Sequence, residues 1–196
     1  PMITSCSPGW VKFAEYYYPD QLDHLSSCKS PQQMTGAVIK TYYAEKMGID
    51  PKDIVNVSVM PCTAKKFEIG REDEDAAGVA DIDIAITTRE LGRMIQRAGI
   101  KFTDLPDEEF DAPLGEDTGA AVICGATGGV MEAALRTAND WLTGEDNQAV
   151  EFTDVRGTAA IKEAAYNIAG LEVKVAVVSG IAGANYVMNA IQNGTA

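Results

Sequence analysis

The cysteines are the first side chains of this sequence to consider as metal ligands or nucleophiles. There are four of them, Cys6, Cys28, Cys62 and Cys124. No two form a CxxC pair, so the spacing indicates neither a zinc ribbon nor a ferredoxin cluster. A shared metal site would have to be assembled by folding. Because free cysteine is often simply a small buried side chain, each of the four also has a purely structural interpretation.

The stretch TSCSPGW places Cys6 among hydroxyls, directly before a Pro-Gly break. A short apolar run precedes it, and the large residues from Trp10 to Tyr17 have helical spacing. Cys6 is therefore expected at a turn from strand to helix. From the residues alone, it can be a metal ligand, a reactive thiol or a buried side chain.

The stretch MPCTAKKFE is more specific. Cys62 follows the β-branched run from Ile54 to Met60, which predicts a strand covered on both faces. Ligands of open α/β sheets bind beyond the carboxyl ends of strands, which is where Cys62 is expected. Lys65 and Glu68 follow, and a nearby ammonium favours the thiolate that a metal ligand or nucleophile requires. The alternative interpretation is a solvated lysine pair beside a buried cysteine.

The glycine-rich stretch from Gly125 to Gly129 could bind an anion at the start of the following helix. Its spacing fits neither the P-loop nor GxGxxG. Tight packing of a helix is the favoured interpretation, and the preceding Cys124 is expected to pack in the interior.

Helices and strands alternate along the chain, as an α/β fold requires. Apolar periodicity, caps and glycines predict helices over 10–17, 32–47, 88–98, 130–141 and 158–169. Strands are predicted over 54–60, 82–86, 150–155 and 172–178, and the first two are expected to be buried. We expect mainly parallel sheets flanked by helices, in two lobes around a cofactor cleft. The polar, proline-containing stretch 101–118 is the expected lobe boundary.

The overall composition excludes several classes of function. Hydrophobic residues make up 46% of the chain and charged residues 23%, as in globular proteins. A net charge of -13 argues against nucleic acid as a partner, because phosphates would be repelled. No apolar run reaches the ~20 residues of a membrane span, and no secretory signal is recognisable. The expected location is the cytoplasm.

Several motifs together resemble one family. In chain order these are TSCSPGW, LSSCKSPQQ, MPCTAKKFE, DIDIAITTREL, GATGGVMEAALRTA, VRGTAAIKEA and VKVAVVSGIA. Their order and content resemble the catalytic domain of iron-only (FeFe) hydrogenases, over nearly the whole chain. The resemblance implies an oxidoreductase that interconverts protons, electrons and molecular hydrogen at an H-cluster. This cofactor is a [4Fe-4S] cubane bridged by a cysteine to a di-iron subcluster that carries CO, CN and a dithiolate.

The resemblance also assigns roles to individual residues. It implies that Cys62 is a cubane ligand, that Lys65 hydrogen-bonds a cyanide, and that Gln32, Pro61 and Met60 neighbour the di-iron unit. In the family pattern TSCCPGW, the first cysteine transfers protons and the second binds the cubane. Cys6 is accordingly the proton-transfer thiol, and Ser7 occupies a metal-ligand position. Ser26 matches a further proton-path serine, and Glu68 matches a glutamate expected to give polar support.

Two departures from the family pattern limit what the chain is expected to do alone. A serine oxygen is a poor replacement for a thiolate at an iron-sulfur cluster. The family's closing segment, roughly MxCxxGCxxGGG with two further ligands, is absent, whereas Cys28 and Cys124 match no ligand position. We therefore expect a partial catalytic domain that needs a missing C-terminal segment or partner chain to complete its ligands.

Two alternatives to a catalytic role remain open at this point. One is a non-catalytic relative, either a hydrogen sensor or a carrier for iron-sulfur cluster assembly. The other is a nucleotide- or anion-binding domain that uses Gly125 to Gly129. Under the hydrogenase interpretation, the expected partners are protons, hydrogen and a ferredoxin-like or NADH-linked redox module.

Overall fold

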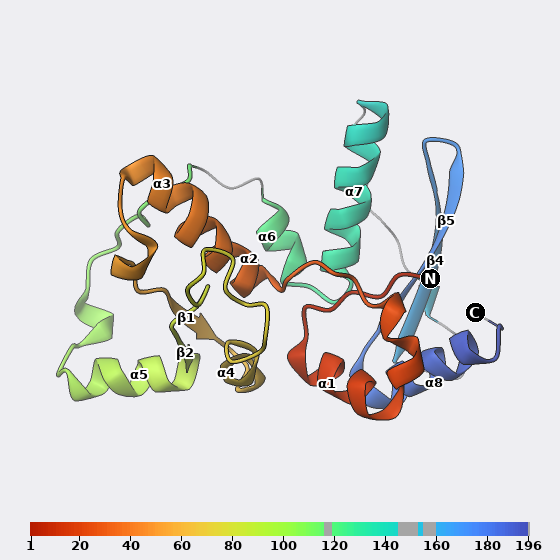
Figure 1. Cartoon of the computed structure of the whole chain (residues 1–196), viewed down its shortest axis with the longest axis horizontal. Coiled ribbons are helices and arrows are strands. Elements are labelled where there is room, and N and C mark those ends of the chain that lie inside the picture. The colour runs from red at the N-terminus through yellow and green to blue at the C-terminus, as the bar shows by residue number, and fades with distance from the viewer. Residues whose placement is uncertain (116–118, 145–152, 155–159, 196) are drawn as a thin grey trace. The chain divides into compact units, whose positions relative to one another are not determined.

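The computed structural model describes residues 1–115, 119–144, 153–154 and 160–195. The chain divides into two compact units, Pro1–Leu114 and Gly115–Ala196. The division lies within the stretch 101–118, which the sequence analysis proposed as a lobe boundary. Figure 1 shows the helices and strands of both units, coloured along the chain.

The first unit begins with helices that precede its strands. These are α1 (Pro8–Tyr17), a 3-10 turn (Pro19–His24), α2 (Pro31–Val38), a π-helical segment (Ile39–Tyr43) and α3 (Ala44–Met47). Pro31 lies in the first turn of α2, where a missing N–H costs nothing. Gly48 adopts the left-handed conformation that ends α3. The helix predicted over 32–47 is thus confirmed as one continuous helical stretch with a π-helical centre.

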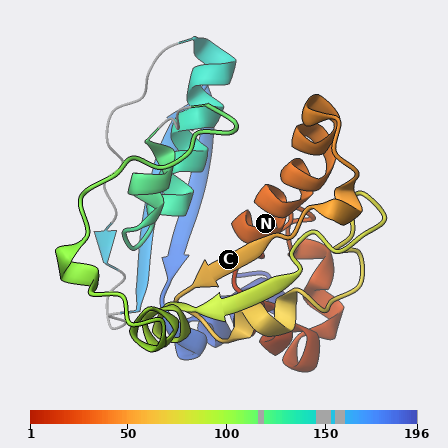
Figure 2. The same cartoon turned by 90° about the vertical axis from the view of Figure 1, so that its left-hand side faces the viewer.

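Two parallel strands follow, each leading into a helix. Strand β1 (Val57–Met60) leads to α4 (Ala64–Glu68), and β2 (Ile84–Thr87) leads to α5 (Thr88–Arg97). Figure 2 shows the two strands side by side and running in the same direction, in the register Val57 to Ile84. Thr87 and Glu90 form the predicted capping box at the start of α5. Short 3-10 turns at Pro51–Asp53 and Phe102–Asp104 complete this unit.

A network of buried polar groups fixes α2 against the strands. A Cβ on Gly36 would lie 2.5 Å from the carbonyl oxygen of Asp81, so only glycine allows this approach. The Asn56 side chain donates to that same oxygen at 2.7 Å. The buried Lys40 ammonium donates to the Ile54 carbonyl at 2.7 Å and pairs with Asp83 at 2.9 Å. These bonds hold α2 and the helical segment after it against the residues that lead into β1 and β2.

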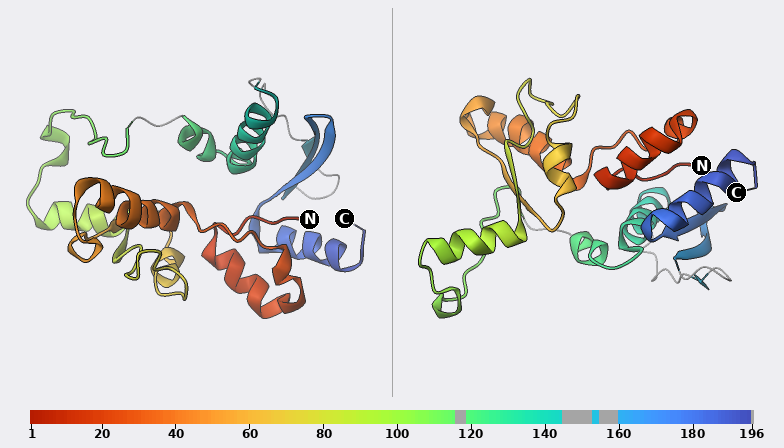
Figure 3. Two further views of the ribbon diagram at one scale, coloured as in Figure 1. Left: turned by 45° about the horizontal axis from the view of Figure 1, so that its top comes forward. Right: turned by 90° about the horizontal axis from the view of Figure 1, so that it is seen from below.

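The second unit contains a helical pair and an antiparallel sheet. Its elements are α6 (Ala120–Cys124), α7 (Gly129–Thr143), β3 (Thr153–Asp154), β4 (Ile161–Ile168), β5 (Leu171–Val178) and α8 (Gly180–Gln192). The order β3-β4-β5 is antiparallel throughout. Leu135 of α7 packs against Ile168 and Val175 of the hairpin, which forms the core of this unit. Figure 3 gives two further views of the hairpin and α8.

The sequence predictions for the second unit are partly wrong. The stretch predicted as a helix over 158–169 is strand β4 from Ile161, with alternating burial along its length. Its alanines favour a helix locally, but pairing with β5 along the whole strand overrides that preference. Among the described residues, β1 and β2 pair in parallel, as does the isolated bridge between Ile3 and Leu25, whereas β3, β4 and β5 pair antiparallel. The α/β class is confirmed. The strand over 172–178 and the helix over 130–141 are confirmed, α8 was not predicted, and most of 150–155 lies outside the described residues.

Candidate functional site

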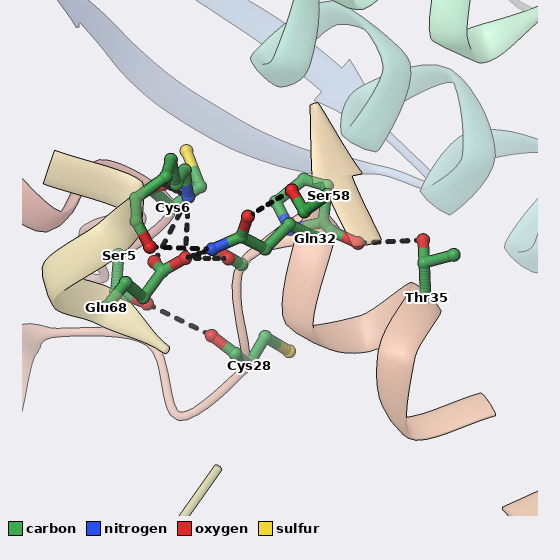
Figure 4. A network of polar contacts seen from close by, with 10 residues as sticks. Ser5, Cys6, Cys28, Gln32, Thr35, Ser58 and Glu68 are labelled. Carbon is green, nitrogen blue, oxygen red and sulfur yellow. Dashed lines mark hydrogen bonds and ion pairs between the residues drawn. The ribbon is translucent and has the colours of Figure 1, made fainter. Parts of the chain in front are cut away.

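Two of the motif segments are joined through their backbones. Ile3 lies beside Leu25 in a parallel bridge, with Ile3 N–H donating to His24 O and Ser26 N–H donating to Ile3 O, both at 2.7 Å. The Ser5 hydroxyl contacts the Ser26 carbonyl at 2.8 Å and the Cys28 carbonyl at 3.1 Å. Figure 4 shows Ser5 and Cys28 beside Cys6 and Glu68. These contacts bring the segment that carries Cys6 and Ser7 against the one that carries Ser26.

Glu68 is the centre of a buried network that joins the third motif to the other two. Its carboxylate accepts hydrogen bonds from Ser30 Oγ at 2.8 Å, Gln32 Nε2 at 2.7 Å and Lys65 Nζ at 2.9 Å (Figure 4). The side chains of Lys65 and Glu68 are only 8% and 6% exposed. Bonds to an ionised group in such surroundings are stronger than neutral ones. Glu68 therefore holds Gln32 and Lys65 in fixed orientations.

Lys65 and Gln32 each make a further hydrogen bond to another segment of the unit. The Lys65 ammonium also donates to the Cys6 carbonyl at 2.8 Å, linking α4 to the TSCSPGW segment. Gln32 accepts from the Ser58 hydroxyl at 2.5 Å, which ties α2 to strand β1. Three segments distant in sequence therefore converge at one point of the first unit. Sequence reasoning did not identify Ser30 and Ser58, because a lone serine carries no signal of the carboxylate or amide that it will meet.

The thiols and the hydroxyl assigned to cofactor chemistry lie at the border of this network. Cys6 is half-buried, whereas Cys62 and Ser7 are exposed. Ser7 occupies the N-cap position of α1, but its hydroxyl makes no capping bond. Helix capping, the ordinary reason for serine at this position, therefore does not account for it. Met60 is half-buried at the end of β1, and Pro61 follows it in an exposed position.

The residues present do not by themselves fit a cubane. A [4Fe-4S] cluster is held by four thiolates, and the described residues include no group of three or more His, Cys, Asp or Glu that could hold a metal. A hydroxyl at position 7 is also a harder and less acidic donor than a thiol. Within the described ranges, Cys62 therefore lacks the companion ligands that a cubane would need.

A cavity of about 360 Å³, lined by both polar and apolar side chains, lies beside the network within the same unit. Its lining includes Ser26, Glu68, Arg71 and Glu74. Burial raises the pKa of Glu74, although Lys29 lies 3.1 Å from its carboxylate. On the same cavity, the hydrogen bond from Arg71 lowers the pKa of Glu15. Ser26 therefore lines the same cavity as Glu15, whose pKa is lowered, and Glu74, whose pKa is raised.

The glycine-rich stretch has a packing role. A Cβ on Gly129 would overlap the carbonyl of Ile123, and Gly128 has a φ of 86°, which disfavours other residues. These glycines let α6 and α7 approach closely, as the favoured interpretation expected. Cys124, however, is exposed, so its assignment to the interior was wrong. No helix in the described part of the chain is long and apolar enough to cross a membrane.

Comparison with known proteins places these motifs in a family. The family model "Iron only hydrogenase large subunit, C-terminal domain" matches residues 1–196. The periplasmic [Fe] hydrogenase large subunit of Nitratidesulfovibrio vulgaris is 54% identical over 180 residues, which are 92% of this chain and 43% of that protein. The NADP-reducing hydrogenase subunit HndD of Solidesulfovibrio fructosivorans is 53% identical over 184 residues, 94% of this chain and 32% of that protein. The chain thus spans less than half the length of these relatives.

A solved structure and a more distant relative complete the comparison. The chain matches an [FeFe]-hydrogenase structure that revealed stepwise H-cluster assembly, with a TM-score of 0.84, 39% identity, and coverage of 100% of this chain and 56% of the other. The cytosolic Fe-S cluster assembly factor NAR1 of Sclerotinia sclerotiorum is 46% identical over 114 residues, 54% of this chain and 20% of that protein. The full-length family match and the higher identity both favour the hydrogenases. This chain belongs to the iron-only hydrogenase large-subunit family, C-terminal domain.

Proposed function

We propose that the chain is part of the catalytic domain of an iron-only hydrogenase, with a lobe boundary at 101–118. The complete protein would interconvert protons, electrons and molecular hydrogen. The observation that carries this proposal is the buried Glu68 network, which joins the TSCSPGW, LSSCKSPQQ and MPCTAKKFE segments. Such a network orients polar groups toward one region and excludes water from their partners, as a preorganised site requires.

The proposed cofactor of the complete protein is the H-cluster. Cys62 is proposed as a cubane ligand, with Gln32, Met60, Pro61 and Lys65 lining the remainder of the cofactor. The hydrogen bonds to Glu68 support these assignments, because they fix the orientation of the Lys65 ammonium and the Gln32 amide, which would donate hydrogen bonds to the cofactor. Because the described ligands are too few, a further segment or a partner chain is proposed to supply the other thiolates.

Proton transfer is proposed for Cys6 and Ser26, with Glu68 as the group that supports them. Cys6 is held through its carbonyl by Lys65, and the Ser26 hydroxyl accepts a hydrogen bond from the Cys28 N–H at 3.2 Å. Ser7 is proposed to stand at a ligand position. In the full-length protein, Ser7→Cys is expected to increase bound iron, whereas Cys6→Ser is expected to retain iron and lose turnover. Loss of iron in Cys6→Ser, with no gain in Ser7→Cys, would make Cys6 the ligand instead.

The electron donor is proposed to be a ferredoxin-like or nicotinamide-linked module, acting in the cytoplasm. The NADP-reducing relative supports a nicotinamide-linked donor. Another relative is periplasmic, so the location needs a test of its own. Fractionation of the native cells, with detection of the full-length protein, tests the location. Reduction of the purified full-length protein by ferredoxin or by NADPH tests the donor.

An experiment on the chain itself tests the need for additional ligands. After anaerobic reconstitution, the 196-residue polypeptide is expected to bind fewer than six irons and to evolve no hydrogen. Turnover by this polypeptide with six bound irons would contradict that expectation. The alternative function, a non-catalytic carrier, is favoured only by the NAR1 relatives, and it predicts no CO or CN infrared bands in the full-length protein.

A further inference from the structure

Helix α5 carries three arginines in an otherwise acidic chain. Arg89, Arg93 and Arg97 are each four residues apart, and all are exposed. At about 3.6 residues per turn, this spacing places them on one face, with about 6 Å of rise between neighbours. We call these three residues the arginine ridge. Figures 1 and 3 show α5, in yellow-green, along the outside of its unit.

Most other cations of the described chain have an anionic partner, but the ridge does not. Lys29, Lys40, Lys65, Lys66 and Arg71 all pair with carboxylates, several of them buried. Within the described ranges, no salt bridge neutralises any of the three ridge guanidinium groups. The ridge therefore presents three positive charges to its surroundings in a chain whose net charge is -13.

Glu90 is the acid best placed to neutralise the ridge, and it is occupied elsewhere. It lies three residues before Arg93, a spacing that ordinarily permits an ion pair on a helix. Instead, its carboxylate accepts from Lys66 at 2.6 Å and from the Thr87 N–H at 2.7 Å. The capping box and α4 therefore hold this carboxylate and leave Arg93 free to bind another anion.

The ridge also borders a shallow groove that includes an apolar side chain. The groove has a volume of about 370 Å³ and is lined by Glu90, Arg93, Met94 and Arg97. Met94 is 55% exposed, and methionine adapts its shape to varied apolar surfaces. Arginine forks bind carboxylates with two parallel hydrogen bonds. A carboxylate-bearing surface with a small apolar contact fits this combination.

We propose that the arginine ridge docks the acidic surface of a partner protein. A compact partner can place a few carboxylates on the ~12 Å ridge. Nucleic acid fits less well, because its phosphates continue past the ridge into a strongly acidic chain. An extended anionic membrane also fits less well, because most of its charge would lie beyond the ~12 Å ridge and face a chain whose net charge is -13. The docking surface stands independently of the proposed function, which bears only on the choice of ferredoxin as a probe.

The test compares two triple variants of the 196-residue chain. Arg89→Gln/Arg93→Gln/Arg97→Gln removes the ridge, while Lys46→Gln/Lys52→Gln/Lys174→Gln removes the same charge from other exposed positions. Binding to a fluorescently labelled ferredoxin of net negative charge, and to a poly-L-glutamate peptide, is measured by anisotropy at low salt. Exposed ion pairs contribute about twofold each, so the ridge variant should bind about tenfold more weakly and the control less than twofold. Thermal melts by circular dichroism should coincide for all chains, since these side chains are exposed.

Several results would overturn the proposal. One is failure of the parent chain to bind either probe, and another is equally weakened binding in both triple variants. A third is ridge-dependent binding of single-stranded DNA or of phosphatidylserine vesicles that is tighter than binding of the acidic probes. Ridge-dependent self-association in sedimentation would likewise assign the face to a second copy of the chain. Ridge-dependent binding of poly-L-glutamate without ferredoxin would support the docking surface and argue against ferredoxin as the partner. If a variant melts differently, the single substitution Arg93→Gln, expected to weaken binding about twofold, replaces it.

Discussion

Removal of the Glu68 charge should destabilise the first unit severely. In Glu68→Gln, the Lys65 ammonium would remain buried with no opposite charge, since its side chain is only 8% exposed. Breaking a buried ion pair on one side costs about 3–5 kcal/mol. Domains of ordinary size have a total stability of about 5–15 kcal/mol, so this loss is a large fraction of it.

A double-mutant cycle separates the pair from its surroundings. Urea unfolding of the 196-residue chain is followed by circular dichroism for Glu68→Gln, Lys65→Met and the double variant. The double variant leaves no uncompensated charge. Its loss in free energy of unfolding should therefore be about 2–3 kcal/mol smaller than the sum of the losses in the two single variants. The exposed pair Lys101 and Asp104 has the same i,i+3 spacing, with side chains 83% and 66% exposed. It is therefore a matched control in which Asp104→Asn should change stability by less than about 0.5 kcal/mol. Additive costs in the Glu68 cycle, or equal effects at the two sites, would refute the reasoning.

Two further outcomes follow from local geometry. Gly129→Ala should destabilise the second unit by more than about 2 kcal/mol, because the added Cβ overlaps the Ile123 carbonyl. In Gly125→Ala the added Cβ would lie 3.3 Å from the Val122 carbonyl oxygen, so this variant should lose less stability. The same urea unfolding midpoint for both variants would contradict this. The hydrogen bond from Lys66, together with the capping box, lowers the pKa of Glu90 from 4.5 to about 2. The ionised Glu90 carboxylate therefore stabilises the fold fully above pH 4.5, and this contribution is lost as the pH falls toward 2. Carboxyl chemical shifts should report that low pKa and its rise in Lys66→Met; an unchanged pKa in the variant would mean that Lys66 is not its main cause.

Much of the first unit could be predicted because its signals are local. Thr87 and Glu90 lie three residues apart and form the capping box that their spacing indicates. Gly48 ends a helix in the left-handed conformation that few other residues adopt. The Glu68 network is different, since Ser30 and Ser58 reach Glu68 and Gln32 only after folding. Family resemblance drew attention to Glu68 and Gln32, but spacing alone could not reveal the residues that bind them.

The errors occur where distant pairing outweighs local preference. The stretch that contains Ala164 and Ala165 has helix-forming composition, yet it forms a strand because β5 pairs with it residue by residue. The packing position expected for Cys124 was also wrong. Cys124 is the last residue of the short helix α6, in which no residue is buried.

The infrared spectrum of the full-length protein, purified without oxygen, distinguishes a hydrogenase from a non-catalytic relative. For a hydrogenase we expect bands of CO and CN bound to iron, together with hydrogen evolution from a reduced electron donor. Both should disappear in Cys62→Ser if Cys62 is a cubane ligand. A protein that contains an iron-sulfur cluster, shows no such bands and evolves no hydrogen would contradict this expectation and identify the chain as part of a non-catalytic relative.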